Sequence, residues 1–308
     1  MTLLYYDDTF LKHDTGRHPE RGLRLRSVIG RLRETGLLGR CDRVDWASAN
    51  DRQLARVHDL DYVRSVRQFA ADGGGRIEQD TVVAPASYAV AQRAAGAVCD
   101  AVDRVVGGEH QHALCLVRPP GHHALPASAM GFCLLNNIAV GALQAVRELQ
   151  LDRVLVIDWD VHHGNGTQDM FWENEQVAFF SIHRWPFYPG SGSADETGAA
   201  RGLGATRNLP VEFGTSRSAY LQRFETELND FASRVKPQLV LISAGFDSHR
   251  EDPVGSLGLE VEDFEQLTKF VLGVADQYAA GRLVSVLEGG YNPDVLAQCV
   301  EVHLRGLL

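Results

Sequence analysis

Five short apolar runs, rich in leucine and β-branched residues, recur along the chain, and amphipathic stretches with a helical pattern lie between most of them. Continuous apolar strands that alternate with helices are typical of a mostly parallel sheet covered by helices on both faces. The sequence therefore predicts an α/β fold. The expected strands are Ala113–Val117, Val154–Ile157, Val177–Ile182, Leu239–Ser243 and Leu283–Leu287, and the expected helices cover roughly Ser87–Val106, Asn137–Leu149, Ser218–Val235, Glu262–Ala280 and Asp294–Leu307.

The length of 308 residues, with 44% hydrophobic content, is enough to bury one large core. No internal repeat, low-complexity tract or long linker divides the chain, and its 30 glycines stand in short clusters typical of loops. We therefore expect a single domain over residues 1–308.

The net charge of −10 argues against nucleic-acid binding, which needs a basic surface for phosphates. We interpret the arginine-rich segment Glu20–Thr35 as a helix with a solvated face, and "EHQH" (Glu109–His112) as a surface loop. No signal peptide or membrane-spanning run is visible, and five cysteines without a CxxC pair favour free thiols. These features predict a cytoplasmic protein without a membrane segment. No feature predicts an oligomeric state.

Polar residues follow all five expected strands. The first strand leads into "RPPGHH" and the second into "DWDVHHGNG", the third ends at Ser181-Ile182-His183, and Asp247 and Tyr291 follow the last two. Ligands of open α/β sheets bind outside the carboxyl ends of the strands. We therefore expect these side chains to meet in one site.

Three of these residues form a candidate metal site. In an extended backbone Asp160 and His162 point to the same side, and Asp247 arrives from a neighbouring strand. Two carboxylates and one imidazole are a reasonable set of protein ligands for catalytic zinc, which keeps one position open for water. Taken alone, Asp160 and His162 would more often cap a turn or pair with arginines, but the convergence with Asp247 and the His-His pair at the same edge favours the metal.

The adjacent His122 and His123 follow a rigid Pro/Gly bend. Adjacent histidines are poor joint ligands but suit proton transfer, because their pKa values lie near neutrality. Asp158 is well placed to orient one of them. His163 and Asn165 are either turn residues or further partners, and their spacing does not decide.

Tyr291 could donate a hydrogen bond to a carbonyl oxygen that becomes negative in the transition state, although a lone tyrosine in a loop is more often a packing residue. A metal, a proton-transfer pair and a hydrogen-bond donor together predict metal-assisted hydrolysis of an amide or related acyl bond.

The sequence resembles the zinc-dependent histone deacetylase family, together with the bacterial histone deacetylase-like amidohydrolases and the acetylpolyamine amidohydrolases. The matching motifs are "HDTGRHPERGLRLR", "RPPGHHA", "MGFCLLNNIA", "DWDVHHGNGTQ", "SIHRW", "SAGFDSHREDPVG" and "LEGGYN". They follow the family's order over residues 13 to 292, and "DWD", "GNG" and "EGGY" resemble its class II branch.

The resemblance implies an arginase/deacetylase fold with one zinc ion on Asp160, His162 and Asp247. It further implies that His122 and His123 are the general acid/base pair, that Asp158 supports the first and Asn165 the second, and that Tyr291 polarises the carbonyl. A structural potassium or sodium ion is implied at Asp158, Asp160, His162, Ser181 and Ile182, and a second, weaker match lies at Phe171, Asn174 and Val177.

The resemblance also implies a substrate tunnel. Gly131 and Phe132 match one wall, and Tyr188 stands where the opposite wall usually has phenylalanine. Val254 occupies the position where some polyamine-selective relatives carry an acidic residue, and Arg24 matches an arginine near the inner acetate pocket.

The leading hypothesis is a zinc-dependent deacylase that removes acyl groups, most often acetyl, from the N-acyl-lysine of a protein or peptide. One alternative is a deacetylase for acetylated polyamines or other small N-acyl amines. A second is a silent module that binds acyl-lysine, although every implied catalytic position is intact. A third is a dimanganese ureohydrolase, which needs further Asp ligands beyond the one complete set.

Overall fold

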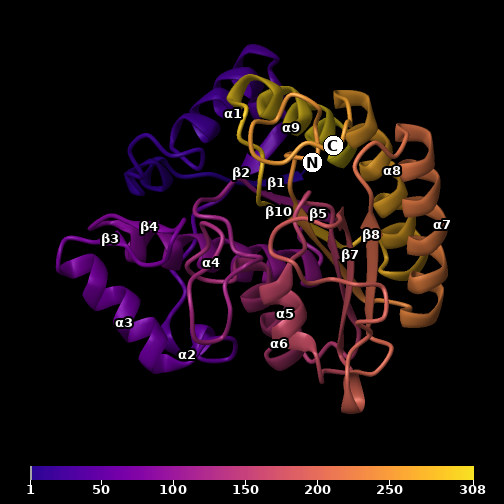
Figure 1. Ribbon diagram of the computed structural model, residues 1–308, viewed down its shortest axis with the longest axis horizontal. Coiled ribbons are helices and arrows are strands. Elements are labelled where there is room, and N and C mark those ends of the chain that lie inside the picture. The colour runs from indigo at the N-terminus through magenta and orange to yellow at the C-terminus, as the bar shows by residue number, and fades with distance from the viewer. Residues whose placement is uncertain (1) are drawn as a thin grey trace.

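The computed structural model describes residues 2–308, and a sheet of eight parallel strands forms its centre (Figure 1). The strands follow the order β2-β1-β5-β10-β9-β6-β7-β8. Their bounds are β1 Thr2–Tyr5, β2 Cys41–Arg43, β5 His112–Cys115, β6 Val154–Asp158, β7 Val177–Arg184, β8 Thr206–Val211, β9 Leu239–Ala244 and β10 Leu283–Leu287. A separate antiparallel pair joins β3 (Gly75–Arg76) to β4 (Val82–Val83).

Helices cover both faces of the sheet, as the sequence predicts (Figure 1). On one face α1 packs on α9, α9 on α8 and α8 on α7, while α4 and α5 pack together on the other face. The bounds are α1 Leu23–Glu34, α2 Asp51–Leu54, α3 Leu60–Ala71, α4 Ser87–Val106, α5 Asn137–Arg147, α6 Asn165–Phe171, α7 Arg217–Val235, α8 Val261–Tyr278 and α9 Pro293–Leu307. Among residues 2–308, no helix is both long and apolar enough to cross a membrane.

The predicted α/β fold is confirmed, and all five predicted strands are present with ends that differ by at most two residues. Strands β6, β9 and β10 are buried along their whole length, which explains why their sequences are mostly apolar, with one polar residue in each. Strands β1, β2 and β8 were not predicted. β2 and β8 are the two edges of the sheet, and their sequences, "CDR" and "TRNLPV", contain no apolar run.

The interpretation of Glu20–Thr35 as a solvated helix requires a correction. Arg24 is completely buried, although the other arginines of the segment are exposed. Its guanidinium lies beside the buried carboxylate of Glu20, which also accepts hydrogen bonds from the buried Arg118. Because buried charges need partners, these side chains form an ionic cluster inside the fold instead of facing water.

Candidate active site

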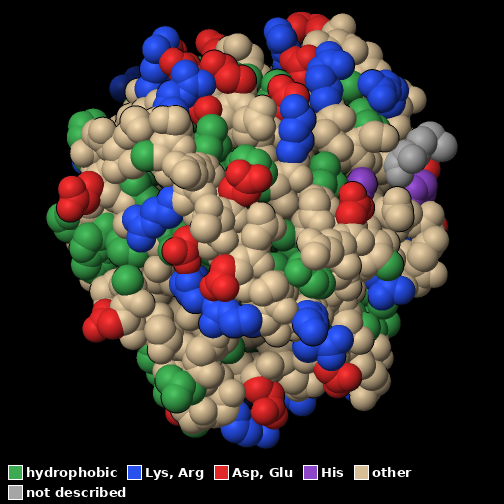
Figure 2. All heavy atoms as spheres, turned by 90° about the vertical axis from the view of Figure 1, so that its right-hand side faces the viewer, with side chains coloured by type: hydrophobic (Ala, Val, Ile, Leu, Met, Phe, Trp, Pro, Cys, Tyr) green, Lys and Arg blue, Asp and Glu red, His purple; other side chains and the backbone are tan. Residues whose placement is uncertain are grey.

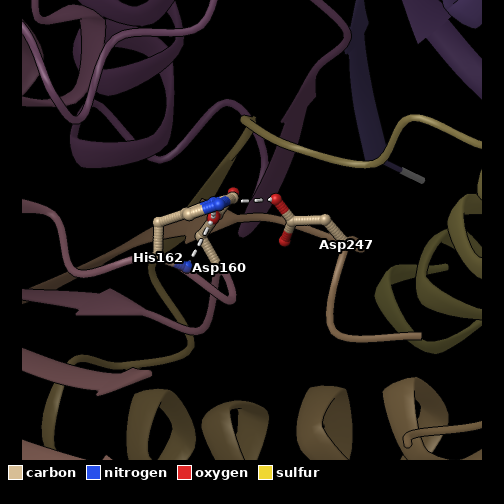
Figure 3. Close-up of side chains that lie close together, drawn as sticks. All are labelled: Asp160, His162 and Asp247. Atoms are coloured by element: carbon tan, nitrogen blue, oxygen red, sulfur yellow. Dashed lines mark hydrogen bonds and ion pairs between the residues drawn. The ribbon is translucent and has the colours of Figure 1, made fainter. Parts of the chain in front are cut away.

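The polar residues that follow the strands do meet at one edge of the sheet. β6 pairs with both β7 and β9, and β10 pairs with both β9 and β5, so the segments after these strands are neighbours. Asp160 and His162 come from the loop after β6, and Asp247 comes from the loop after β9 (Figure 3). The carboxyl ends of parallel strands therefore assemble the site.

Asp160, His162 and Asp247 point toward one another and are buried (Figure 3). Nδ1 of His162 lies 3.0 Å from Oδ1 of Asp160 and 3.2 Å from Oδ2 of Asp247. One ligand atom from each residue falls within 4.8 Å of the others. Oδ2 of Asp247 makes no hydrogen bond of good geometry, although it is buried. A buried carboxylate oxygen that no well-formed hydrogen bond satisfies suits a cation, and this donor set fits zinc.

Two glycines let the backbone approach these carboxylates. A Cβ atom on Gly289 would lie 2.1 Å from Oδ2 of Asp247, and one on Gly245 would lie 2.1 Å from Oδ2 of Asp160. The amide of Gly289 instead donates a hydrogen bond of 2.8 Å to Oδ2 of Asp160. The "SAG" and "EGG" motifs therefore provide space that any side chain would fill.

The electrostatics of the cluster are those of a cation site. Burial and the nearby Asp160 raise the pKa of Asp247 to about 7. Burial alone would lower the pKa of His162, but the hydrogen bonds and charges of both aspartates raise it to about 9. Two buried carboxylates at such short range repel each other, and a divalent cation between them would remove that repulsion.

Each histidine of the pair has its own hydrogen-bond partner. Nδ1 of His122 lies 2.9 Å from Oδ2 of Asp158, and Nδ1 of His123 lies 2.7 Å from Oδ1 of Asn165. The two rings lie side by side, with centroids 4.0 Å apart. When Nδ1–H donates to these oxygens, Nε2 of each ring is left for a reacting group.

The two rings differ in proton affinity. Burial opposes the charged form of His122, but Asp158 and Asp160 outweigh it and raise the pKa to about 10. Burial and the neighbouring His122 and His162 hold the pKa of His123 well below its usual range. Adjacent groups with opposite shifts are suited to one acid and one base role.

A buried carboxylate lies behind the pair, and the sequence did not reveal it. Oε2 of Glu288 accepts hydrogen bonds from the amides of Gly121 (2.6 Å) and His122 (3.2 Å). Burial raises the pKa of Glu288 to about 7. The sequence shows only the glutamate itself, in "EGGY". Its partners are backbone amides, which every residue except proline has, so no sequence motif indicates the contact.

Tyr291 is buried at the same edge, and burial raises its pKa well above the usual range. Arg24 lies under its ring, 4.9 Å from the centroid, and donates to the backbone oxygens of Glu288 and Gly290. The phenol is therefore neutral and can donate a hydrogen bond, and Arg24 holds the backbone of its loop by hydrogen bonds.

A cavity of about 210 Å³ leads to these groups. All four residues predicted for the tunnel line it, together with two histidines of the site, Tyr291 and two residues that the sequence did not indicate; the set is Asp80, His123, Gly131, Phe132, His162, Phe187, Tyr188, Val254 and Tyr291. Phe187 is stacked on the His162 ring at 5.3 Å. A larger surface groove of about 560 Å³ around Trp172 contains none of these residues.

The residues of the expected monovalent sites also lie close together. Asp158 of β6 pairs with Ser181 of β7, beside Ile182. In the second set the amide of Asn174 donates to the oxygen of Phe171, and its side chain accepts from the amide of Val177. His163, whose role the sequence left open, contacts Ser191 and Gln168 through its two nitrogens.

The fold and the site define a class of enzyme. The histone deacetylase domain matches residues 18–307, and the chain belongs to the histone deacetylase family of hydrolytic deacetylases. It is 36% identical to the "Histone deacetylase-like amidohydrolase" of Pseudomonas aeruginosa, over 97% of this chain and 83% of that one. It is 39% identical to the human "Polyamine deacetylase HDAC10", over 99% of this chain but 48% of that protein. The crystal structure of the HDA15 HD domain superposes with a TM-score of 0.93 at 34% identity, covering 99% of this chain and 87% of that one.

Proposed function

We propose that this protein is a zinc-dependent deacylase that hydrolyses the amide of N-acyl-lysine and takes acetyl groups best. The observation that carries the proposal is that one buried site combines three features: an Asp-His-Asp cluster, two histidines with separate partners, and a tyrosine that lines a cavity. Bound zinc would supply a water of lowered pKa and would polarise the acyl carbonyl.

The two histidines divide the proton transfers. His122 is fixed by Asp158 and His123 by Asn165, so that Nε2 of each ring faces the reacting groups. Nε2 of His122 lies 3.9 Å from Oδ1 of Asp160, which puts this nitrogen next to the ligand cluster. One histidine takes the proton of the attacking water, and the protonated one returns a proton to the leaving amine.

Tyr291 completes the set. Its high pKa keeps the hydroxyl protonated at neutral pH, so that it donates a hydrogen bond to the acyl oxygen as negative charge develops there. The aromatic walls, Phe132 and Phe187 with Tyr188, exclude water around the alkyl chain of the substrate.

A second substrate class is favoured by the rim of the cavity. Asp80 and Tyr188 line the cavity and also a neighbouring groove of about 410 Å³, which Glu78 lines as well. Two carboxylates near the mouth would attract a substrate with a further ammonium group, as in an acetylated polyamine. The 39% identity to a polyamine deacetylase supports this alternative. Val254, an apolar residue that lines the cavity, favours the lysine substrate.

A dimanganese ureohydrolase and a silent binding module find less support. Within residues 2–308, Asp160, His162 and Asp247 are the only group of three ligating side chains within reach of one ion, so that a ureohydrolase would lack its second set. A silent binding module would not need both histidine partners and the glycines that accommodate the carboxylates.

We further propose that residues 1–308 form a single catalytic domain. Asp158, Asp160, His162, Ser181 and Ile182 would hold a potassium or sodium ion, and Phe171, Asn174 and Val177 would hold a second one. The five cysteines are all free thiols, which supports a reducing compartment such as the cytoplasm. An acidic net charge supports a substrate other than nucleic acid.

The test is deacylation by the zinc-loaded protein of an acetyl-lysine peptide and an acetylated polyamine in parallel, with a chelator control. We expect turnover of the peptide that the chelator abolishes and zinc restores. Preference for the polyamine would replace the lysine substrate by the second candidate. Turnover that is insensitive to the chelator would contradict the metal mechanism.

A further inference from the structure

Asp252 is a buried carboxylate that connects two walls of the cavity. It lies in the loop after β9 and is 8% exposed. Its Oδ1 accepts hydrogen bonds from the amides of Val254 (2.9 Å) and Gly255 (3.0 Å), and its Oδ2 accepts from the amide of Tyr291 (2.6 Å). One side chain therefore joins the segment that carries Val254 to the segment that carries the phenol.

The same segment is fixed at two further points. The amide of Ser256 donates a hydrogen bond of 2.7 Å to the backbone oxygen of Asp247, a member of the ligand cluster. On its outer side the oxygen of Gly255 accepts a hydrogen bond of 3.1 Å from Arg184. The guanidinium of Arg184 in turn lies 4.1 Å from the ring centroid of Phe187, which also lines the cavity.

The consequence for Tyr291 is geometric. Asp252 holds its backbone amide, while Arg24 holds the backbone oxygens of Glu288 and Gly290. Gly290, the residue just before Tyr291, has a φ of +119°, a conformation that glycine adopts freely. Because glycine has no side chain, it restrains the backbone at this point very little. The position of the phenol is therefore set by the hydrogen bonds on both sides of it.

We propose that Asp252 is a positioning residue for the deacylation reaction: it holds Tyr291 at a fixed place relative to Asp247 and to the Val254 wall. The inference rests on the proposed function, since it assigns to Tyr291 the role of donor to the acyl oxygen. Asp252 does not line the cavity, so it acts through Tyr291.

The substitution Asp252→Asn isolates this role. The amide has nearly the shape of the carboxylate, but whichever way it is turned, its NH₂ group faces an N–H group of either Tyr291 or the Val254 segment. A displacement of about 1 Å at a catalytic group can cost about 10²-fold in rate. We expect kcat on the acetyl-lysine peptide to fall by about 10- to 100-fold, with a much smaller change in KM.

Introducing Asp252→Asn into the Tyr291→Phe variant separates an effect on the position of the phenol from a general structural effect. If Asp252 acts through the phenol, Asp252→Asn costs less than about threefold once the hydroxyl is gone, because residues that act as a unit are not additive. A full second loss in the double variant would overturn the proposal. The matched control is Glu251→Gln, which removes a carboxylate from the exposed neighbouring side chain and leaves kcat unchanged.

A readout without turnover decides the proposal independently of the proposed function. Hydrogen exchange of the metal-free protein reports on the Tyr291 amide directly. We expect this amide to be protected in the wild type, like the amides of β10, and to lose at least about tenfold of that protection in Asp252→Asn but not in Glu251→Gln. A Tyr291 amide that exchanges as fast in the wild type as in an open loop would overturn the role of Asp252, whatever substrate the enzyme takes.

Discussion

Nδ1 of His122 lies 2.9 Å from Oδ2 of Asp158, and both side chains are buried. This contact fixes the tautomer of the histidine and supplies the negative charge that raises its pKa, while Asp158 itself stands outside the Asp-His-Asp cluster. The arrangement supports the proposed role of Asp158 as the partner of His122, which gives each carboxylate of "DWD" a separate contact.

Asp158→Asn tests that role. The amide keeps the shape but presents no charge, and its NH₂ group can force the imidazole into the wrong tautomer. In a related His–Asp pair such a change costs about 10⁴ in rate, and we expect a loss of about 10² to 10⁴ in kcat here. Steady-state kinetics with zinc content measured in the same sample would check it. A loss of kcat that is proportional to the loss of bound zinc would instead show that Asp158 acts by retaining the zinc ion.

Tyr291→Phe removes the hydroxyl and little else. Loss of one oxyanion donor typically costs about 10² to 10³ in rate, so we expect kcat to fall by that amount while zinc binding is unchanged. Turnover of an acetyl-lysine peptide at the wild-type rate would disprove the donor role. Since Arg24 remains under the phenylalanine ring, the melting temperature should change little and serves as the control.

Asp247→Asn weakens the metal site. A neutral amide is a poorer zinc ligand than a carboxylate, and it also removes the charge that balances the cation. We expect zinc to be lost in dialysis against a weak chelator that leaves the wild type loaded, with elemental analysis as the measurement. Full occupancy of the variant would count against Asp247 as a ligand.

Glu20→Gln probes the buried ionic cluster. Glu20 accepts hydrogen bonds from both Arg24 and Arg118, and all three side chains are completely buried. Removing the only carboxylate of this group leaves two guanidinium charges poorly paired, which should lower the free energy of unfolding by about 3–5 kcal/mol. Chemical denaturation measures this. Glu262→Gln, which removes the exposed partner of Arg217, should change stability by less than about 0.5 kcal/mol.

His58 makes stability depend on pH. Burial lowers its pKa from 6.5 to about 4 and outweighs the hydrogen bond from Nδ1 to the oxygen of Leu125, which acts in the opposite direction. Nε2 accepts a hydrogen bond from the amide of Asn136, and this contact needs the neutral ring. The unfolded chain binds the proton more readily, so this contribution is complete above pH 6.5 and is lost as the pH falls toward 4.

By linkage, protonation of His58 should lower the free energy of unfolding by about 2 kcal/mol at pH 5 relative to neutral pH. His58→Gln, which keeps an acceptor but does not titrate, should therefore show a correspondingly smaller drop between pH 7.5 and pH 5 in denaturant unfolding. Equal drops in the two proteins would refute the assignment.

Much of the site could be predicted because its residues follow strands in the sequence. An apolar run that ends in "DWDVHH" indicates both the strand and the polar group at its end, and the parallel pairing of β6 with β9 then brings Asp247 to Asp160. Phe187 was harder to foresee, because its neighbour Tyr188 already filled the expected position on the tunnel wall.

The sequence by itself determined the α/β fold, the five central strands and the residues gathered at their ends, because continuous apolar runs and polar clusters are local patterns. Only the tertiary structure decided that Arg24 is buried, that β2 and β8 complete the sheet, and that Glu288 and Asp252 bind the backbone of His122 and Tyr291. These features depend on which distant segments meet. A carboxylate that accepts hydrogen bonds from backbone amides can be satisfied by any residue except proline. No spacing along the chain records such a contact.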